Sequence, residues 1–219
     1  MRKIRILYRK LGRSVYISHL DIMRTFQRAF KRADIDVKHT EGFNPHPYIS
    51  IALPLSLGYS GEYELLDIVL QSAETEAELV VKLNAALPEG IEAVKAYENG
   101  RPVRDIAYSE FLMLLDYDKS LPDDAEEEVK SLLNMNEIVI VKRSKRGEKE
   151  TDIAQMINSA EVSLCEGGLV IRAVLAAGAT MLNPEYLVKA IEKYRPEYAP
   201  SFCEIAHTNI FDKEMKIFR

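Results

Sequence analysis

Two different apolar periodicities follow one another at the start of this 219-residue chain. Ile4, Ile6 and Tyr8 recur at every second position, which predicts a strand. Residues 20–33 instead carry most of their apolar side chains on one half of a helix. Ser18-His19-Leu20-Asp21 opens this helix with the spacing of a capping box, with Asp in place of Glu. The chain therefore begins as a strand followed by an amphipathic helix that can pack on a sheet.

The same two patterns alternate along the rest of the chain. Strands are expected at 48–53, 63–70 and 91–97, with a helix that starts at Thr75. A turn-rich stretch at 99–102 is the expected boundary, after which the order repeats: strands at 108–117, 138–141, 160–176 (a hairpin) and 202–206, and helices at 122–134 and after Asn183. We predict an α+β protein of two tandem ferredoxin-like (β-α-β-β-α-β) units, residues 1–100 and 101–219.

Composition excludes several classes of function. The net charge of -5 gives no bulk attraction to nucleic acid or acidic lipid, so such binding would need a local patch. No apolar stretch approaches the roughly 20 residues that span a bilayer, and the first residues do not resemble a signal peptide, so we expect a cytoplasmic protein without membrane contact. Cys165 and Cys203 stand far apart, without the spacing of zinc or iron-sulfur ligands. No metal or cofactor is expected.

A local basic patch is encoded near the amino terminus. Residues 1–48 hold eleven Lys or Arg against four Asp or Glu, whereas residues 59–98 hold two against nine. At 100° per residue, four cations fall within an arc of about 100° opposite the apolar half of the first helix: Arg24, Arg28, Lys31 and Arg32. With Arg5 and Arg9 they could contact RNA phosphates without reading bases. The alternative is a solvated face that pairs with the protein's own acidic residues.

A second basic run lies in the second unit, between the two helices expected there. Lys142, Arg143, Lys145 and Arg146 follow a predicted buried strand and suggest a hairpin tip that touches phosphate. The alternative is that these charges only keep an edge strand from pairing between molecules.

The segment 42–47, Gly42-Phe43-Asn44-Pro45-His46-Pro47, is expected to be a stiff loop because its prolines restrict the backbone. Phe43 is expected to anchor the loop in the core. His19, His46 and Asp21 are candidate catalytic residues, as acid, base and orienting group. The alternative is structural: a buried His19 that ties the loop to the helix, and an Asp21 that completes the helix cap.

The Ser18-His19-Leu20-Asp21 and 42–47 blocks, with Arg28-Ala29, Arg32-Ala33 and Pro54-Leu55-Ser56-Leu57-Gly58, resemble the radical SAM-linked protein family of bacteria, a family of unknown function. The resemblance implies a radical SAM protein as partner, and a genetic context of ribosomal and RNA-processing proteins. The present chain has no cluster-binding cysteines, so it is similar to the stand-alone accessory members. Phe43, Asn44 and His46 are then the residues expected at the surface that meets the partner or substrate.

Three functions remain open from the sequence. The first is a module that binds RNA or a ribosomal particle and presents it to the radical SAM enzyme. The second is an enzyme that uses His19, His46 and Asp21. The third is a docking partner with a purely structural role.

Overall fold

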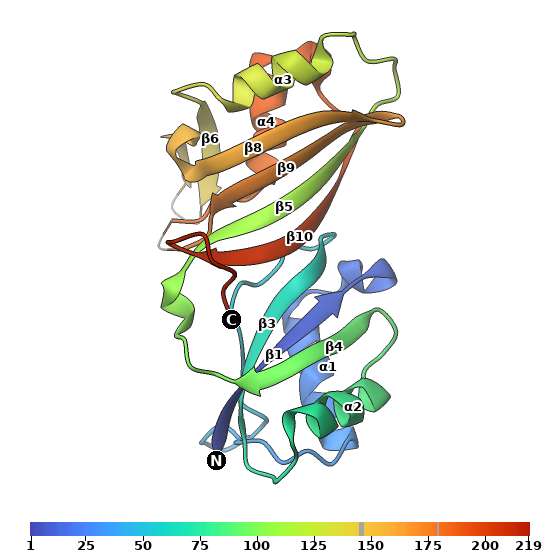
Figure 1. Cartoon of the computed structure of the whole chain (residues 1–219), viewed down its shortest axis with the longest axis vertical. Coiled ribbons are helices and arrows are strands. Elements are labelled where there is room, and N and C mark those ends of the chain that lie inside the picture. Colours follow the sequence, from blue (N-terminus) through green and yellow to red (C-terminus); the bar gives the residue numbers. More distant parts are fainter. Residues whose placement is uncertain (145–146, 179) are drawn as a thin grey trace. The chain divides into compact units, whose positions relative to one another are not determined.

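The chain folds into an α+β protein with two compact units, one of residues Met1–Val103 with Arg219 and one of residues Arg104–Phe218 (Figure 1). The structure is a computed structural model, and it describes residues 1–144, 147–178 and 180–219.

The first unit contains four strands and two helices among its described elements: β1 (Arg2–Lys10), α1 (His19–Arg32), β2 (Ile49–Ile51), β3 (Ser60–Leu70), α2 (Glu76–Ala86) and β4 (Ile91–Glu98). A short 3-10 turn, η1 (Gly12–Tyr16), precedes α1. The sheet order is β4-β1-β3, with β2 paired to the other edge of β3, and each pair is antiparallel. The predicted strands are confirmed, although the one expected at 48–53 is only three residues long.

One face of this sheet packs against both helices. Ile4, Ile6 and Tyr8 of β1 share a buried cluster with Phe26 and Phe30 of α1 and with Leu79 and Leu83 of α2. Tyr8 and Phe26 meet edge to face, with ring centroids 4.9 Å apart. The apolar face of β1, with its period of two, and the apolar half of α1 therefore pack against each other in one core.

Both helices begin as the sequence predicts. Ser18 Oγ accepts a hydrogen bond from the Asp21 backbone N–H at 3.2 Å, and Thr75 forms a full capping box with Glu78. Leu20 does not join the apolar side of α1, since it is 64% exposed. At 100° per residue it lies roughly 130° from the centre of the buried face, at the edge of the cationic arc.

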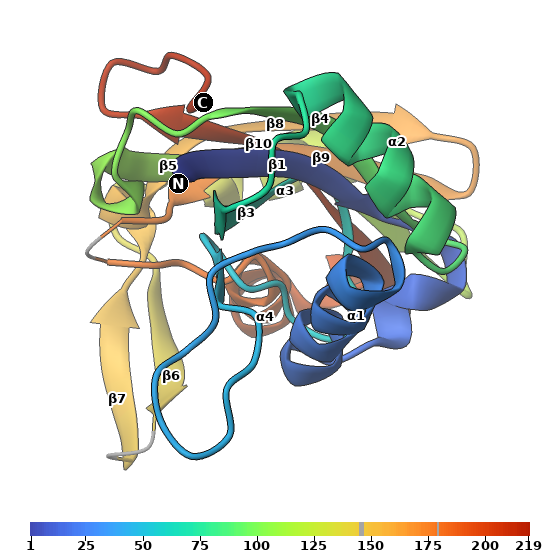
Figure 2. The ribbon, with the colours of Figure 1, turned by 90° about the horizontal axis from the view of Figure 1, so that it is seen from below.

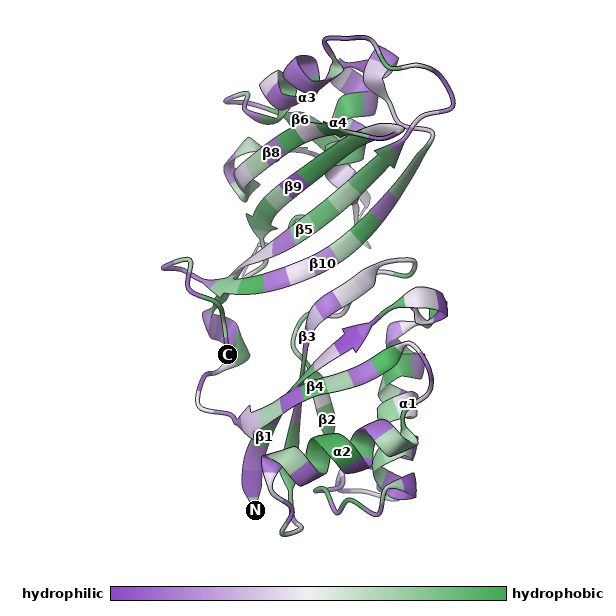
Figure 3. Cartoon of the chain, turned by 45° about the vertical axis from the view of Figure 1, so that its right-hand side comes forward, coloured by the Kyte–Doolittle hydropathy of each residue, from purple (hydrophilic) through white to green (hydrophobic). Residues whose placement is uncertain are grey.

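The second unit follows the same alternation with an insertion. A short 3-10 helix, η2 (Val103–Asp105), spans the boundary between the units. The elements of the second unit are β5 (Ile106–Asp116), α3 (Ala125–Leu133), β6 (Val139–Ser144), β7 (Gly147–Asp152), η3 (Ala154–Met156), β8 (Ile157–Cys165), β9 (Gly168–Ala176), α4 (Glu185–Tyr194), η4 (Pro196–Tyr198) and β10 (Phe202–Asp212). Within this unit the sheet order is β10-β5-β9-β8, again antiparallel. Helices α3 and α4 lie on the same side of that sheet (Figure 1), and β5 and β9 are hydrophobic over most of their length (Figure 3).

The strand expected at 138–141 does not enter this sheet. It forms β6, which pairs with β7 in a separate two-stranded sheet. Ile138 and Ile140 are buried while Val141 is 43% exposed, so one face of the hairpin packs and the other meets solvent. Burial alone could not distinguish a strand of the main sheet from a strand of this smaller one.

Candidate functional site

The outer face of α1 carries the four cations that the sequence placed together. Arg24, Arg28, Lys31 and Arg32 are all exposed. Arg24 Nη1 lies 3.0 Å from Asp21 Oδ1, and Arg32 Nη2 donates to the carbonyl oxygen of Ala86. Both Arg28 and Lys31 line an open pocket beside the helix.

The other wall of this pocket is a hairpin built from the segment after α1. Thr40 N–H donates to His46 O at 2.9 Å and Tyr48 N–H donates to Lys38 O at 2.8 Å, so the two arms pair across residues 38–48. Gly42, near the tip, has a φ of 125°, a conformation that glycine adopts without strain. Gln27 Nε2 of α1 donates to Pro47 O at 3.3 Å and joins the hairpin to the helix. Figure 2 shows this segment as a long loop that leaves α1 and returns to the sheet.

The pocket between α1 and the hairpin has a volume of about 530 Å³. The cations Arg28 and Lys31 line it from α1, and the imidazoles of His39 and His46 line it from the hairpin. Two carboxylates, Asp34 and Asp36, lie just after the end of the helix. Asp34 adopts a left-handed conformation with φ 52°, which ends α1 and turns the chain toward the hairpin. The size is within the range of about 300–1,000 Å³ that is usual for small-ligand pockets.

The two imidazoles of the pocket are oriented by backbone carbonyls. His46 Nδ1 lies 3.1 Å from Asn44 O and 3.2 Å from Thr40 Oγ1, and His39 Nδ1 lies 2.9 Å from Val37 O. A carbonyl oxygen only accepts, so the proton of each neutral ring is on Nδ1 and the Nε2 atom is an acceptor.

The three candidate catalytic residues do not share one site. His46 lines the 530 Å³ pocket, whereas half-buried His19 lines a cavity of about 10 Å³ with Tyr8 and Lys10, enough for a single water molecule. Asp21 is exposed, and hydrogen bonds from Ser18 and Arg24 lower the pKa of its carboxyl group. Its contacts are those of a cap residue, because its carboxylate oxygens lie 2.7 Å from Ser18 Oγ and 3.0 Å from Arg24 Nη1.

Arg5 does not belong to an exposed cationic surface, which corrects the sequence-based expectation. Arg5 lies on β1, the strand between β3 and β4, and its side chain is fully buried, with Nε 2.7 Å from Asp67 Oδ1 and Nη2 2.8 Å from Asp67 Oδ2. Arg9 remains exposed and lies 3.8 Å from Glu92 on β4. The face of β1 that looks polar in the sequence is therefore partly an internal ion-pair site.

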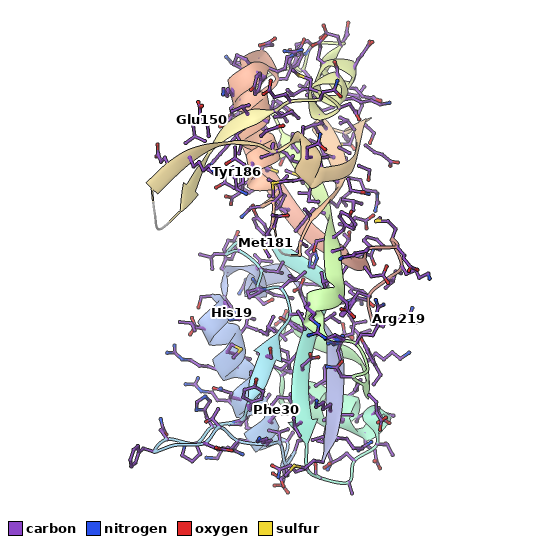
Figure 4. The ribbon with its side chains drawn as sticks, turned by 90° about the vertical axis from the view of Figure 1, so that its left-hand side faces the viewer. His19, Phe30, Glu150, Met181, Tyr186 and Arg219 are labelled. Atoms are coloured by element: carbon purple, nitrogen blue, oxygen red, sulfur yellow. The ribbon has the colours of Figure 1, made fainter. Side chains whose placement is uncertain are left out.

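Phe43 is not an anchor of the loop in the core. It is fully exposed, at 112% of the reference area, and Asn44 and His46 are exposed beside it. The hairpin reaches outward from the first unit, as the side view of the ribbon shows (Figure 4), so its tip has no core to enter.

The second basic run lies partly on the β6–β7 hairpin. Arg143 is opposite Glu148 in the strand register, and Lys145 and Arg146 lie outside the described residues. Lys142 Nζ donates to Met181 O at 3.1 Å and lies 5.3 Å from the ring centroid of Tyr186 (labelled in Figure 4). Burial lowers the pKa of the Lys142 ammonium.

Tyr186 was missed by the sequence analysis. Lys189 Nζ of α4 also lies over its ring, at 5.0 Å from the centroid, so two ammonium groups share one aromatic side chain. The three-residue spacing of Tyr186 and Lys189 on a helix could have indicated this pair, whereas the approach of Lys142 from β6 requires the tertiary structure.

Within the described part of the chain, His, Cys, Asp and Glu side chains do not gather in threes as a metal site would require. No helix among the described residues is both long and apolar enough to cross a membrane.

The chain is thus an α+β protein in which a cationic helix lies beside an open pocket lined by imidazoles. Residues 3–184 match the family described as "Uncharacterized protein conserved in bacteria (DUF2344)", and the chain belongs to this family. No curated protein matches the sequence.

The solved structures supply a likeness of fold. A chain from "Crystal Structure of a Cbf5-Nop10-Gar1 Complex" is 13% identical, with a TM-score of 0.53 over 94% of this chain and 48% of that chain. The present chain thus spans about half the length of that relative. The second similar structure, an unknown protein from Galdieria sulphuraria, is 15% identical and covers 94% of this chain and 96% of that chain, with a TM-score of 0.27.

Proposed function

We propose that this chain is an accessory protein that binds RNA, or RNA within a ribosomal particle, through α1 and the 38–48 hairpin, and presents it to a radical SAM enzyme. The observation that carries the proposal is the position of Arg28 and Lys31, which are exposed on α1 and line the same 530 Å³ pocket as His39 and His46.

The proposed contact is mainly with phosphate. Arg28 and Lys31 reach the pocket from one wall, while Arg24 and Arg32 extend the cationic face along the helix. Phosphate contacts of this kind dominate nucleic-acid affinity and make it dependent on salt. The described part of the structure offers two cations at the pocket against two carboxylates, Asp34 and Asp36, so we expect modest affinity rather than tight binding.

The carboxylates give the pocket polar acceptors beside its cations. Asp34 and Asp36 can accept hydrogen bonds from base amino groups or from the ribose 2′-hydroxyl, which distinguishes RNA from DNA. The Nε2 atoms of His39 and His46 add acceptors on the opposite wall. The pocket is therefore suited to one nucleotide of an RNA whose neighbouring phosphates lie along α1.

The radical SAM partner is supported by the sequence resemblance of the Ser18–Asp21 and 42–47 blocks. The second of these blocks is the exposed hairpin tip with Phe43, Asn44 and His46. A surface that both receives RNA and faces an enzyme would place the bound nucleotide next to that enzyme.

We also propose that each unit is ferredoxin-like and folds as a separate domain, with β6–β7 as an insertion in the second. The strand orders β4-β1-β3-β2 and β10-β5-β9-β8 and the two helices on one face support this assignment. The enzymatic alternative loses support because His19, Asp21 and His46 occupy three different surroundings.

Salt-dependent binding of a fluorescein-labelled RNA tests the proposal by anisotropy. The Arg28→Glu/Lys31→Glu variant should bind at least about tenfold more weakly, and the slope of log affinity against log salt should fall by about 1 to 2. The matched control is Lys95→Glu/Lys119→Glu, which changes the net charge equally at two exposed lysines far from the pocket in sequence. Equal effects of the two variants would attribute binding to net charge alone and would overturn the proposed site.

Crosslinking in cells tests the complete role. We expect the wild-type chain to recover both RNA and a protein with a radical SAM cluster motif, and the Arg28→Glu/Lys31→Glu chain to lose the RNA. Recovery of the enzyme without RNA from the wild type would favour a purely structural docking role.

A further inference from the structure

Phe43 is the feature of this surface that phosphate binding does not use. Its ring is fully exposed at the tip of the hairpin, flanked by Glu41, Gly42 and Asn44, which are exposed as well. Isolated exposed apolar side chains are common on protein surfaces. The geometry and the chemistry around this one give it a specific use.

The hairpin fixes the backbone that carries the ring. Two hydrogen bonds tie its arms, Thr40 N–H to His46 O and Tyr48 N–H to Lys38 O, and Gln27 ties the second arm to α1. Pro45 and Pro47 restrict the backbone directly after the tip. Because the backbone is already fixed, only the side-chain rotamer of Phe43 has to be ordered when a flat partner covers the ring.

The hairpin connects the ring to the cationic pocket. Pro45 and His46, two and three residues after Phe43, line the pocket with Arg28 and Lys31. A strand of RNA with a phosphate at these cations would run alongside the hairpin that carries the ring. Base stacking on an aromatic ring beside a basic groove is the usual mode of single-strand binding.

We infer that Phe43 stacks on an unpaired base of the RNA while Arg28 and Lys31 hold a neighbouring phosphate, so that the substrate is a single-stranded segment or loop. This inference rests on the proposed function and makes it more specific. A base inside an A-form duplex is stacked on its neighbours and does not present its face to a side chain.

An unpaired base fits this tip better than a protein partner does. A stable protein interface buries about 800 Å² on each side around several apolar anchors. Phe43 is the one large apolar side chain in the exposed segment 41–46, where Pro45 is the other apolar residue. The pocket beside it is lined by the cations Arg28 and Lys31 as well as by apolar residues such as Phe30 and Ile35. One exposed ring next to two cations matches the alternation of base and phosphate.

Anisotropy with a labelled single-stranded RNA and with a blunt duplex of the same sequence tests the inference. Phe43→Ala should weaken single-strand binding by about five- to 150-fold, change duplex binding less than twofold, and leave the salt slope unchanged. Phe43→Tyr should retain the affinity and Phe43→Leu should not, because leucine replaces the apolar area without a π face. The matched control, Phe202→Ala, removes a phenylalanine that is 58% exposed on the second unit and should change neither affinity.

A fluorescence measurement reads the contact directly. The chain contains no tryptophan, so Phe43→Trp introduces a single reporter whose emission should be quenched on addition of the single-stranded RNA. Phe202→Trp should not respond. Absence of quenching at position 43, or equal weakening of single-strand and duplex binding by Phe43→Ala, would overturn the inference.

The outcomes separate the two proposals. If Arg28→Glu/Lys31→Glu weakens binding but Phe43→Ala does not, the RNA-binding function stands and the stacking inference fails. If the wild-type chain binds neither RNA, both fail, and Phe43 is left as a contact to protein.

Discussion

The guanidinium of Arg5 on β1 is paired with the carboxylate of Asp67 on β3, through Nε–Oδ1 and Nη2–Oδ2 distances of 2.7 and 2.8 Å. Nη2 also donates to Arg101 O at 3.0 Å. The two residues are directly opposite in the antiparallel register. This bidentate geometry is the strongest form of an Arg–carboxylate pair.

Removal of Asp67 should therefore be costly. Asp67→Ala leaves a fully buried guanidinium without its carboxylate, and we expect the free energy of unfolding to fall by about 3–5 kcal/mol. The double variant Arg5→Met/Asp67→Leu should recover much of that loss, since neither charge is then buried. Urea unfolding measures both. A loss below about 1 kcal/mol for Asp67→Ala would show that water reaches Arg5.

The cap of α1 provides a second stability prediction. Ser18→Ala removes the side-chain acceptor of the Asp21 N–H and should lower the free energy of unfolding by about 1 kcal/mol, while Ser18→Asn should retain most of it. Thr75→Ala at the start of α2 should have a similar effect, because Thr75 caps Glu78 in the same way. Thermal melts of the three variants check this, and a neutral Ser18→Ala would contradict the assigned cap.

Acid sensitivity should depend on Glu74. Hydrogen bonds from Lys82, with Nζ at 2.8 Å, and from Ser72 lower the pKa of the Glu74 carboxyl from its ordinary 4.5 to about 2. The unfolded chain takes up this proton near pH 4.5 and the folded chain only near pH 2. Glu74 thus contributes stability that is complete above pH 4.5 and is lost as the pH falls toward 2.

Glu74→Gln should abolish that contribution. At neutral pH the variant should be less stable by about 1–2 kcal/mol, and below about pH 4 its disadvantage should shrink. Urea unfolding at a series of pH values measures the difference. Glu62→Gln, at an exposed glutamate on β3, is the control and should follow the wild type. A constant gap between Glu74→Gln and the wild type at all pH values would contradict the lowered pKa.

The thiol of Cys203 should react slowly with disulfide reagents in the folded chain. Burial, with the Asp116 charge as a second cause, raises the pKa of this thiol to about 12. In a Cys165→Ser background, Cys203 should react with a disulfide reagent near pH 8 at least about a hundredfold more slowly than in the urea-unfolded chain, because the thiolate is the nucleophile. Similar rates in the two states would contradict the burial of the thiol.

The amino-acid pattern determined the helices and strands of this protein and, for α1, which side chains lie on each of its faces. The alternation of Ile4, Ile6 and Tyr8, the apolar half of α1 and the Ser18 cap are local properties, because side-chain direction repeats with a fixed period in a strand and in a helix. The gathering of Arg24, Arg28, Lys31 and Arg32 on one exposed face follows from the same geometry.

What lies against the remaining faces was decided by the tertiary structure alone. Periodicity shows that Arg5 is on the second face of β1. It does not show that Asp67 of β3 and Tyr97 of β4 lie beside Arg5, so the sequence predicted an exposed side chain where the structure has a buried one. In the same way, the sequence shows that Phe43 is apolar but not that its hairpin extends past the core. The pocket forms because the 38–48 hairpin returns to α1, where Gln27 contacts Pro47. These two residues are 20 positions apart, and no local pattern encodes their contact.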